Sequence, residues 1–566
     1  MDILASCNNL TKYHGTELIF KDASIEIHDR DRIGIVGKNG SGKSTFCNCI
    51  AGKDTEYDGK VIINSGTQIG YFRQLYRPYK EKDLAQSVFD YVLQSQKLLL
   101  DKEVELNEIM QLVSKDPSKE NLRKLSELQD FFDHNEGYTL LDRIEKALIG
   151  LGIKPNGDGF RNISWDTKLH ELSGGERKIV ELATIVIQKN INLLILDEPM
   201  GHLDMYARTW MDEFIKAFQG AVVVVSHDRE LLTNSVNKIL TIEDKKLCNY
   251  PGNYPIFVKL RRNKIDMINK EWKIYEKEKL KKEEHLKEIR DWVLKSGSET
   301  MQRLWTVEKR KYEKFIGNPP TNPQIYAKNF SIKEYTVKRF GQIAIRFNDF
   351  NFSFHNPENN KNQIIFKNTN ALSVNGDKIG LVGLNGVGKS TLFRIILSRY
   401  CYDRKLPPSY FGIDNFYNQN ITDISKSDIY IGPSLTIGYF DQQHSNIPED
   451  KTIEEYLGEL GYVDKGKLYG IMNQFSIAKG MEYKLIKDLS GGEKARIQLI
   501  KIQTEQPSLL LLDEPVNHLD IEDKEIVHEF LQKFKGNMII ISHDRYLLRK
   551  VVNKYWEINN QAIIDM

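Results

Sequence analysis

Gly37-Lys-Asn-Gly-Ser-Gly-Lys-Ser44 decides the fold of this chain, and Gly383-Leu-Asn-Gly-Val-Gly-Lys-Ser390 repeats it. Each copy follows an apolar run that predicts a buried strand, residues 33–36 and 379–382, and opens a segment that predicts a helix. A glycine-rich loop in that position, the P-loop, turns its backbone N–H groups toward phosphate oxygens, and the helix N-terminus adds a favourable dipole. The sequence therefore predicts two phosphate-binding sites.

Three further motifs repeat along the chain at offsets of 316 or 317 residues. They are Leu172-Ser-Gly-Gly-Glu176 with Leu489-Ser-Gly-Gly-Glu493, Leu193-Leu-Ile-Leu-Asp-Glu-Pro199 with Leu509-Leu-Leu-Leu-Asp-Glu-Pro515, and Val225-Ser-His-Asp-Arg229 with Ile541-Ser-His-Asp-Arg545. The P-loop lysines, Lys43 and Lys389, are 346 residues apart instead. Insertions of different size must therefore interrupt the two copies.

Composition excludes several classes of protein. With 566 residues, 40% hydrophobic and 28% charged, the chain has the make-up of a globular protein of several domains. A mean hydropathy of −0.46 and the lack of any apolar run near 18 residues argue against a membrane span. The N-terminus lacks the pattern of a secretory signal, and five scattered cysteines suggest neither disulfides nor zinc. We expect a cytoplasmic protein.

Together the motifs resemble those of ATP-binding-cassette (ABC) domains, and the set is complete in both copies. Besides the P-loop and the LSGGE signature, it comprises the glutamine loop (Gln74 and Gln442), the Walker B strand with its Asp-Glu pair (Leu193–Pro199 and Leu509–Pro515) and the switch histidine (His227 and His543). Two cassettes, a charged linker and no membrane segment resemble subfamily F (ABC-F), the soluble ribosome-associated members. The resemblance implies an α/β fold of two tandem ABC-type P-loop ATPase domains, each with a helical subdomain. The expected domains are residues 1–253, with a helical insertion at about 77–165, a helical hairpin linker at 254–325 with its tip near 293–305, and residues 326–566.

The resemblance also implies ATP and Mg²⁺ as ligands and assigns roles to the matched positions. Glu198 and Glu514 would activate the attacking water as general bases, while His227 and His543 would contact the γ-phosphate. The expected magnesium ligands are Ser44, Gln74, Asp197, Ser390, Gln442 and Asp513. The expected ATP-binding P-loop residues are Gly37, Lys38, Asn39, Gly40, Ser41, Gly42, Lys43, Ser44 and Thr45, and Gly383, Leu384, Asn385, Gly386, Val387, Gly388, Lys389, Ser390 and Thr391.

Each LSGGE loop would serve the nucleotide held by the other domain, so that ATP closes the domains around two composite sites. One site would join the Lys43 P-loop to Ser490, Gly491 and Gly492, and the other the Lys389 P-loop to Ser173, Gly174 and Gly175. In the first copy, Met200-Gly201 replaces the Thr-Asn usual for the subfamily, which weakens that loop's contacts across the interface.

Aromatic residues upstream of each P-loop are candidates for stacking on adenine. Tyr13 and Phe354 occupy strand-end positions suited to this role, and ordinary strand packing is the alternative.

Two segments account for the unequal spacing. Residues 94–138 of the first copy are rich in Leu, Lys and Glu at helical spacing and break at Asp116-Pro117. They predict a helical hairpin, either an arm like that of the subfamily or a packing extension without a partner. Residues 402–427 of the second copy are rich in Tyr, Asn, Asp and Pro. They predict a surface loop.

The linker concentrates positive charge. Residues 259–314 contain 18 basic and 11 acidic side chains, a net charge of +7 in a chain whose total is +2. Helical periodicity runs from about Pro255 to Leu294, Ser296-Gly-Ser298 predicts a turn, and a second helix is expected at about 299–316. Three of the six tryptophans lie here, at 272, 292 and 305. Cations and aromatic planes together suit contacts with RNA, although a merely solvated hairpin is the alternative.

In ABC-F proteins this linker enters the ribosomal tRNA exit site and points toward the peptidyl-transferase centre. The resemblance therefore implies the ribosome as partner, through large-subunit rRNA and peptidyl-site tRNA, and a monomer whose two cassettes pair with each other. The expected contact residues at the tip are Trp292, Val293, Leu294, Lys295, Ser296, Gly297, Ser298, Met301, Arg303, Leu304 and Trp305. The tip is apolar and weakly basic, which is more similar to members that protect ribosomes from antibiotics.

Three functions from different classes remain open. The first and favoured one is a ribosome-binding ATPase, either protecting against drugs or acting as a housekeeping factor on stalled ribosomes. The second is the ATPase subunit of a separate membrane transporter, which leaves the basic hairpin without a purpose. The third is a DNA-repair or chromosome-associated ATPase of the same superfamily, which usually carries zinc modules or very long coiled coils.

Overall fold

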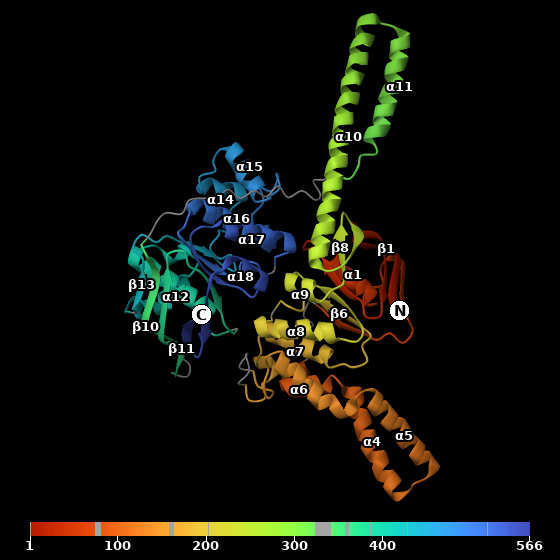
Figure 1. Ribbon diagram of the computed structural model, residues 1–566, viewed down its shortest axis with the longest axis vertical. Coiled ribbons are helices and arrows are strands. Elements are labelled where there is room, and N and C mark those ends of the chain that lie inside the picture. The colour runs from red at the N-terminus through yellow and green to blue at the C-terminus, as the bar shows by residue number, and fades with distance from the viewer. Residues whose placement is uncertain are drawn as a thin grey trace. The chain divides into compact units, whose positions relative to one another are not determined.

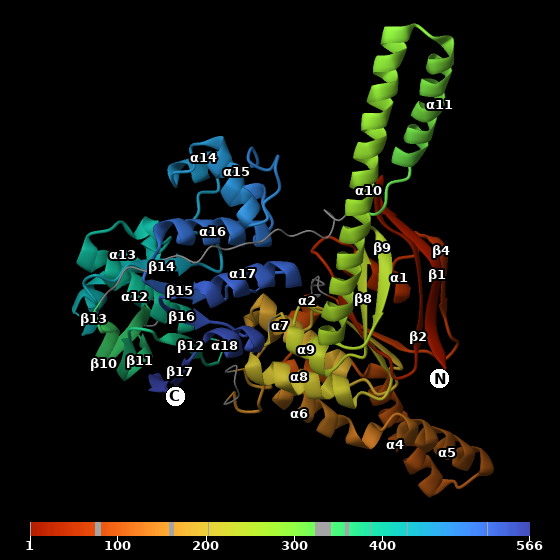
Figure 2. The ribbon, with the colours of Figure 1, turned by 45° about the horizontal axis from the view of Figure 1, so that its top comes forward.

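The computed structural model describes residues 2–73, 81–157, 163–201, 203–322, 341–356, 361–384, 386–426, 428–517 and 519–566. By its contacts the chain divides into two units, which Figures 1 and 2 show. One unit joins Met1–Asn249 with Phe330–Met566 and holds both motif sets. The other unit is Tyr250–Asn329.

A mixed sheet of nine strands forms the first cassette, in the order β4-β1-β2-β9-β8-β3-β7-β6-β5. Neighbours from β8 to β5 pair in parallel, whereas β1 pairs antiparallel with β2 and β4. The strands are β1 Ile3–His14, β2 Glu17–His28, β3 Arg32–Val36, β4 Asp58–Ile63, β5 Ile69–Phe72, β6 Leu193–Asp197, β7 Ala221–Val225, β8 Lys238–Glu243 and β9 Lys246–Pro251. Every residue of β6 and β7 is buried, as in parallel strands covered on both faces.

Three adjacent strands carry the repeated motifs at their carboxyl ends. The P-loop follows β3, Walker B ends β6, and the switch histidine follows β7, the strand between them. Because these strands are parallel and in register, with Asp197 opposite Val225, their ends meet at one edge of the sheet. This is the edge where open α/β sheets bind ligands.

The second cassette repeats this arrangement with its strands divided between two sheets. Its six-stranded sheet has the order β14-β15-β16-β12-β17-β18, and a separate three-stranded sheet has the order β11-β10-β13. The strands are β10 Ile343–Asn356, β11 Lys361–Val374, β12 Lys378–Val382, β13 Ile429–Ile431, β14 Ile437–Phe440, β15 Leu509–Asp513, β16 Asn537–Ile541, β17 Lys554–Asn559 and β18 Ala562–Asp565. Strands β12, β16 and β15 are parallel neighbours and carry the same three motifs.

Helices follow the P-loops and build the helical subdomains. In the first cassette they are α1 Lys43–Ile50, α2 Glu81–Leu84, α3 Val88–Gln94, α4 Lys97–Lys115, α5 Lys119–His134, α6 Leu140–Gly150, α7 Gly174–Val186, α8 Met205–Ala217 and α9 Arg229–Asn234. In the second they are α12 Lys389–Arg404, α13 Asp414–Lys426, α14 Ile453–Glu459, α15 Lys465–Gln474, α16 Gly491–Glu505, α17 Ile521–Lys533 and α18 Arg545–Val551. Helices α4 and α5 lie side by side in Figures 1 and 2 and confirm the predicted hairpin, with its break at 116–118.

The prediction of a surface loop at 402–427 is wrong. Helix α12 extends to Arg404, a short 3₁₀ turn covers Pro408–Tyr410, and α13 occupies Asp414–Lys426. Phe411, Phe416 and Ile424 are buried in the core of this cassette. Spaced apolar side chains that reach a core outweigh the weak helix propensity of the Asn and Asp between them.

The unit Tyr250–Asn329 contains an αα-hairpin, α10 Tyr254–Ser296 and α11 Glu299–Ile316, which confirms both predicted helices. The 43 residues of α10 span about 65 Å at 1.5 Å each. Gly297 has φ 60°, the left-handed conformation that ends a helix. Tyr275 stacks on Phe315 of the other helix at 4.9 Å and contacts Trp272 at 5.4 Å, so Trp272 belongs to the aromatic contact between the helices.

We predict that Gly220→Ala destabilises the first cassette. A Cβ at this position, just before β7, would lie 2.2 Å from the backbone oxygen of Asn192, which cannot move without distorting β6. Overpacking of this kind costs about 1–3 kcal/mol, and thermal denaturation should show a lower midpoint. Gly470→Ala on α15 is the matched control, because its Cβ would have no neighbour within 4 Å. A midpoint for Gly220→Ala equal to that of the control would contradict the prediction.

Candidate functional site

Each P-loop folds back on its own lysine. Lys43 Nζ donates to the carbonyls of Gly37 and Lys38, both at 2.9 Å, and Lys389 Nζ donates to those of Gly383 and Leu384 at 2.8 and 2.7 Å. Burial lowers the pKa of both lysines. The nearby Walker B carboxylates act in the opposite direction and favour the charged ammonium. The two loops thus each hold a buried cation at a helix N-terminus, the arrangement that binds phosphate.

Two glycines of the P-loops are irreplaceable on steric grounds. Gly42 and Gly388 cap α1 and α12 with φ 96° and 102°, which side chains rarely adopt. A Cβ would also lie 2.4 Å from Ile19 in the first loop and 2.6 Å from Ile365 in the second.

The two Walker B glutamates have an unusual backbone. Glu198 and Glu514 have φ 50° and 47°, and each donates its N–H to the end of the neighbouring strand, at Val225 and Ile541, at 2.9 Å. A non-glycine residue in this conformation costs of order 1–3 kcal/mol and persists where the surroundings fix it. Its appearance at the same motif position in both copies points to a functional constraint rather than a local accident.

Burial gives these carboxyl groups the proton affinity of a general base. It raises the pKa of Glu198 to about 7 against the opposing effect of Lys43 and Lys524, and that of Glu514 to about 7 against Arg208 and Lys389. A base works best when its pKa lies near the operating pH.

Both switch histidines lie beside these glutamates. His227 Nε2 is 3.4 Å from Glu198 Oε1, and His543 Nε2 is 3.5 Å from Glu514 Oε1. Burial, reinforced by Lys43 and Lys524, lowers the pKa of His227 well below its usual value, so this imidazole is neutral at pH 7. Within the described residues, the two ring nitrogens of His227 and Glu198 Oε1 are buried without a hydrogen-bond partner. A water molecule and a phosphate oxygen would satisfy these atoms.

The donor set at the second P-loop fits magnesium. The Ser390 hydroxyl bonds to Asp513, and Gln442 lines the same cavity. Hydroxyl, carboxylate and amide oxygens are hard ligands that Mg²⁺ accepts together with waters and substrate phosphates. In the described part of the chain, no three or more His, Cys, Asp or Glu gather into a metal site of their own.

One cavity of about 440 Å³ joins the second P-loop to the signature motif of the first cassette. Its lining includes Ser173, Gly175 and Glu176 from the first cassette and Gly386, Gly388, Lys389, Ser390, Thr391, Gln442, Asp513, Glu514 and His543 from the second. Ser173 and Ser490 cap α7 and α16 through reciprocal bonds with Glu176 and Glu493, which fixes the turn that begins each signature helix.

A second and larger cavity, of about 1160 Å³, surrounds the first P-loop. Its lining includes Asn39, Gly40, Gly42, Lys43, Ser44, Thr45, Asp197, Glu198 and His227. From the second cassette it contains Asn517, Leu519 and Lys524, whereas the described residues Ser490, Gly491 and Gly492 lie outside the lining. The structure therefore brings one expected composite site together and leaves the other open, and the larger volume of this cavity agrees with that difference.

Neither of the two aromatic residues predicted to stack on adenine lines the cavity at its P-loop. Lys12 and His14 line the larger cavity while Tyr13, between them, does not and is 48% exposed. The Phe354 ring packs edge-on against Phe352, with ring centroids 5.2 Å apart, and against Phe416, at 6.0 Å. Phe354 does not line the smaller cavity. For Phe354 the structure favours the alternative of strand packing, whereas Tyr13 lies largely exposed outside the cavity lining. Gln74 and Asn385 lie outside the described residues.

Sequence reasoning missed two cations that reach across the cassettes. Arg208 Nη1 donates to the backbone carbonyl of His543 at 3.2 Å, and Lys524 Nζ donates to that of His227 at 2.8 Å. The two positions are 316 residues apart, the offset of the switch motifs themselves. That offset is the signal that could have identified them.

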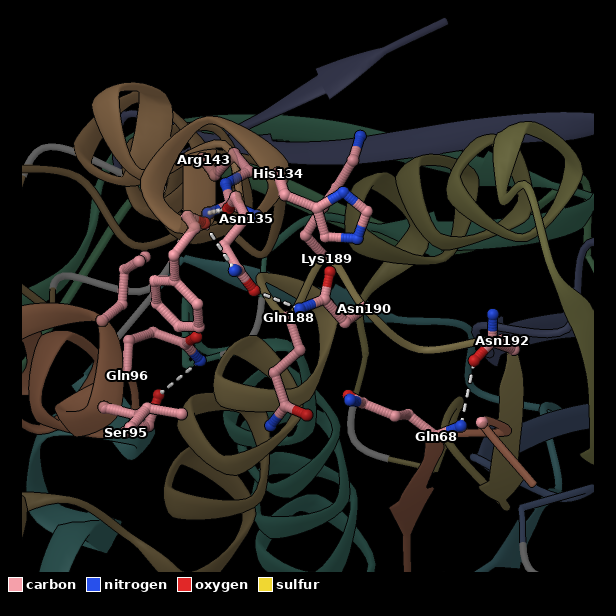
Figure 3. Close-up of a pocket in the computed structure, with 14 residues that line it drawn as sticks. Gln68, Ser95, Gln96, His134, Asn135, Arg143, Gln188, Lys189, Asn190 and Asn192 are labelled. Carbon is pink, nitrogen blue, oxygen red and sulfur yellow. Dashed lines mark hydrogen bonds between the residues drawn. The ribbon is translucent and has the colours of Figure 1, made fainter. Parts of the chain in front are cut away.

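A separate polar cavity of about 740 Å³ lies at the base of the α4–α5 hairpin (Figure 3). Its side chains mostly bond to each other or to nearby backbone: Asn190 to Asn135, Asn135 to the Phe131 carbonyl, and Gln96 to Ser95. Asn192 accepts from the backbone of Gln68 at 2.9 Å, which ties the loop before β6 to β5. This amide network joins the hairpin to the sheet.

Comparison with known proteins places the chain in a family. The model of the ABC transporter family matches residues 20–201 and 366–517. The chain is 28% identical over its full length to the uncharacterized ABC transporter ATP-binding protein YfmR of Bacillus subtilis, covering 82% of that protein. It is 27% identical to the ATP-binding protein Uup of Escherichia coli, with 97% of this chain and 80% of that protein covered. It is 26% identical to the energy-dependent translational throttle protein EttA of Mycobacterium tuberculosis, with 97% and 90% covered.

Solved structures agree on the fold. The archaeal ribosome recycling factor aABCE1, in complex with the stalk protein aP1, superposes with a TM-score of 0.52 at 15% identity, covering 99% of this chain and 90% of that one. Among the described residues, no helix is both long and apolar enough to cross a bilayer. With two cassettes matched to the family model and two-cassette relatives along its whole length, the chain belongs to the ABC transporter family and is an ATP hydrolase of its subfamily F.

Proposed function

We propose that this ATPase binds the ribosome near the tRNA exit site and acts on the peptidyl-transferase centre, protecting it from antibiotics. The observation that carries the proposal is the hairpin α10–α11, which combines a net charge of +7 over residues 259–314 with apolar side chains at its tip. Trp292 and Leu294 are 59% and 74% exposed. Exposed aromatic and apolar groups beside cations suit RNA, in which unstacked bases lie next to phosphates.

The hairpin would be the contact element and the cassettes the motor. Its Lys and Arg residues would supply phosphate contacts with large-subunit rRNA and the peptidyl-site tRNA, a salt-dependent and sequence-blind attraction. Its tip, residues 292–305, would reach the drug-binding region. The protein would work as a monomer in the cytoplasm, with its two cassettes paired.

ATP would close the cassettes and its hydrolysis would reopen them. In each site the P-loop lysine and backbone would hold the phosphates, and Asp197 with Ser44, or Asp513 with Ser390, would hold Mg²⁺. Mg²⁺ supplies charge neutralisation between the phosphates. Glu198 and Glu514, with pKa values of about 7, would take a proton from the attacking water, and the neighbouring histidine would hold that water in place.

A housekeeping role in translation is the second candidate, favoured by the similarity to a protein named as an energy-dependent translational throttle. Both candidates require ribosome binding, and they differ in whether growth in a drug depends on the protein. A transporter subunit would instead sediment with membranes.

The first test of this function removes both general bases. In Glu198→Gln with Glu514→Gln, the amides keep the size of the side chains but cannot accept the proton, so ATP binds and the cassettes stay closed. The variant should accumulate on ribosomes in sucrose gradients and inhibit translation. The control is the same variant with Lys43→Met and Lys389→Met added, which should bind little ATP and stay off ribosomes. Release of the glutamine variant at the rate of the wild type would show that hydrolysis is not the exit step.

The second test concerns the asymmetry of the two sites. The cavity at Lys389 contains Ser173 and Gly175 of the opposite signature, while the one at Lys43 lacks its counterpart. Gly201 in the first cassette also stands where Asn517 stands in the second. We expect Glu514→Gln to lose more ATPase activity than Glu198→Gln, with ATP binding unchanged in both. Equal losses would contradict this.

The third test concerns the tip. Replacing residues 293–305 by Gly and Ser at equal length should keep ATP binding, weaken ribosome association only partly, and abolish growth in drugs of the peptidyl-transferase centre. Trp292→Ala and Trp305→Ala should each give a partial loss, because one base stacked on an aromatic ring contributes about 1–3 kcal/mol.

The matched control for the tip is Ile274→Ala, which removes a side chain that is 61% exposed on the same helix, five turns away. It should protect like the wild type. Full protection by the Gly/Ser variant would reduce the tip to a passive support. A wild type that protects against no such drug would favour the housekeeping role.

A further inference from the structure

We propose that Arg208 and Lys524 are positioning residues that couple ATP hydrolysis at the two sites. They join the two switch loops, the segments that follow β7 and β16 and contain His227 and His543, into one closed ring of contacts. The inference concerns the ATPase activity and its two sites, and does not depend on what the hairpin binds.

The two cations occupy equivalent and largely buried positions. Each lies in the first turn of the helix that follows the Walker B loop, Arg208 on α8 and Lys524 on α17. Their side chains are 12% and 10% exposed. A buried charge is costly unless it is paired and hydrogen-bonded, so each contact it makes is held firmly.

Each cation contacts both switch loops. Lys524 donates to the carbonyl of His227 in the first cassette at 2.8 Å and lies 3.4 Å from Asp544 in its own. Arg208 donates to the carbonyl of His543 in the second cassette at 3.2 Å and lies 3.3 Å from Asp228 in its own. Because Asp228 follows His227 and Asp544 follows His543 in the chain, these four contacts close a ring through both loops.

The aspartates in the ring cannot move independently of their cassettes. Asp228 caps α9 by accepting from the backbone of Glu230 and Leu231 at 2.9 and 3.1 Å. Asp544 caps α18 by accepting from the backbone of Leu547 at 2.9 Å. The ring therefore ties each histidine carbonyl to a helix cap of the opposite cassette.

The contacts outside the ring do not repeat in the same way. Arg545 pairs with Asp212 and Glu230 across the interface, both at 2.6 Å. Its counterpart Arg229 pairs with Glu525, at 3.4 Å, and also contacts the carbonyl of Ile521, at 3.3 Å, and the ring of His528, at 3.5 Å. Side chains at the outer interface thus differ between the halves, whereas the cation-to-carbonyl contacts of the ring are kept in both.

A histidine whose carbonyl is held has its imidazole placed as well. His227 and His543 each lie within 3.5 Å of the catalytic glutamate of their site. When one switch loop moves after its phosphate leaves, the cation bonded to the histidine carbonyl of that loop must move with it or lose the hydrogen bond. The same cation pairs with the aspartate next to the other histidine, so the position of the other switch loop changes as well. Two sites that bias one shared element are coupled reciprocally.

The experiment measures ATPase rate against ATP concentration in the purified full-length chain. The wild type should show a Hill coefficient above 1. In Arg208→Met with Lys524→Met, which keeps the aliphatic part of each side chain but removes the donors, the Hill coefficient should fall to 1 and kcat at least tenfold, with the Kd for a fluorescent ATP analogue within about twofold. Arg208→Lys with Lys524→Arg, which restores charge and reach, should recover cooperativity.

Controls separate coupling from stability. Lys216→Met with Lys533→Met removes one cation from the far end of each of the same helices and should leave the Hill coefficient unchanged. Arg208→Gln alone keeps a donor for Asp228 but is too short to reach His543 as well, so it should lower the Hill coefficient even where the double methionine variant is unstable. A wild-type Hill coefficient of 1, or cooperativity that survives in Arg208→Gln and in any folded methionine variant, would overturn the proposal. Absence of any ATPase activity in the wild type would instead refute the ATP sites on which it rests.

Discussion

The parallel pairing of three buried strands is the constraint on which the rest of this molecule depends. Strands β3, β7 and β6, and their counterparts β12, β16 and β15, bring the P-loop, the switch histidine and Walker B to one edge of each sheet. The P-loop lysine and the Walker B aspartate are 154 residues apart in the first copy and 124 in the second, and they meet there because backbone hydrogen bonds fix the register. Burial at that edge then raises the pKa of Glu198 and Glu514 to about 7, so the same packing that stabilises the sheet prepares its chemistry.

Much of this was predictable because the constraints are local. Gly42 and Gly388 require a backbone that only glycine adopts easily, so the motif carries its own conformation. Long helical periodicity likewise predicted α4, α5, α10 and α11. The apolar runs of the first copy likewise predicted buried strands, which β3 and β7 confirm, whereas the order of the strands in the sheet was not predicted.

The rest depends on contacts between distant residues, which no single segment records. The stretch 402–427 has the composition of a loop, yet Phe411 and Ile424 reach the core and the segment forms α13. Tyr13 and Phe354 have the expected type and position, but Phe354 packs against Phe352 and Phe416 and Tyr13 lies largely exposed, both outside the cavity linings. Arg208 and Lys524 are ordinary helix residues until the opposite cassette places a carbonyl beside each.

The self-contained packing of the hairpin has an evolutionary consequence. Tyr275, Trp272 and Phe315 hold α10 against α11 within the unit Tyr250–Asn329 itself, and the turn needs little more than Gly297 in its left-handed conformation. Sequence drift beyond these aromatics, including insertions and deletions at the turn, leaves the strands and loops of the cassettes untouched. Natural selection can therefore change the exposed residues at the turn while the residues of the cassettes stay the same.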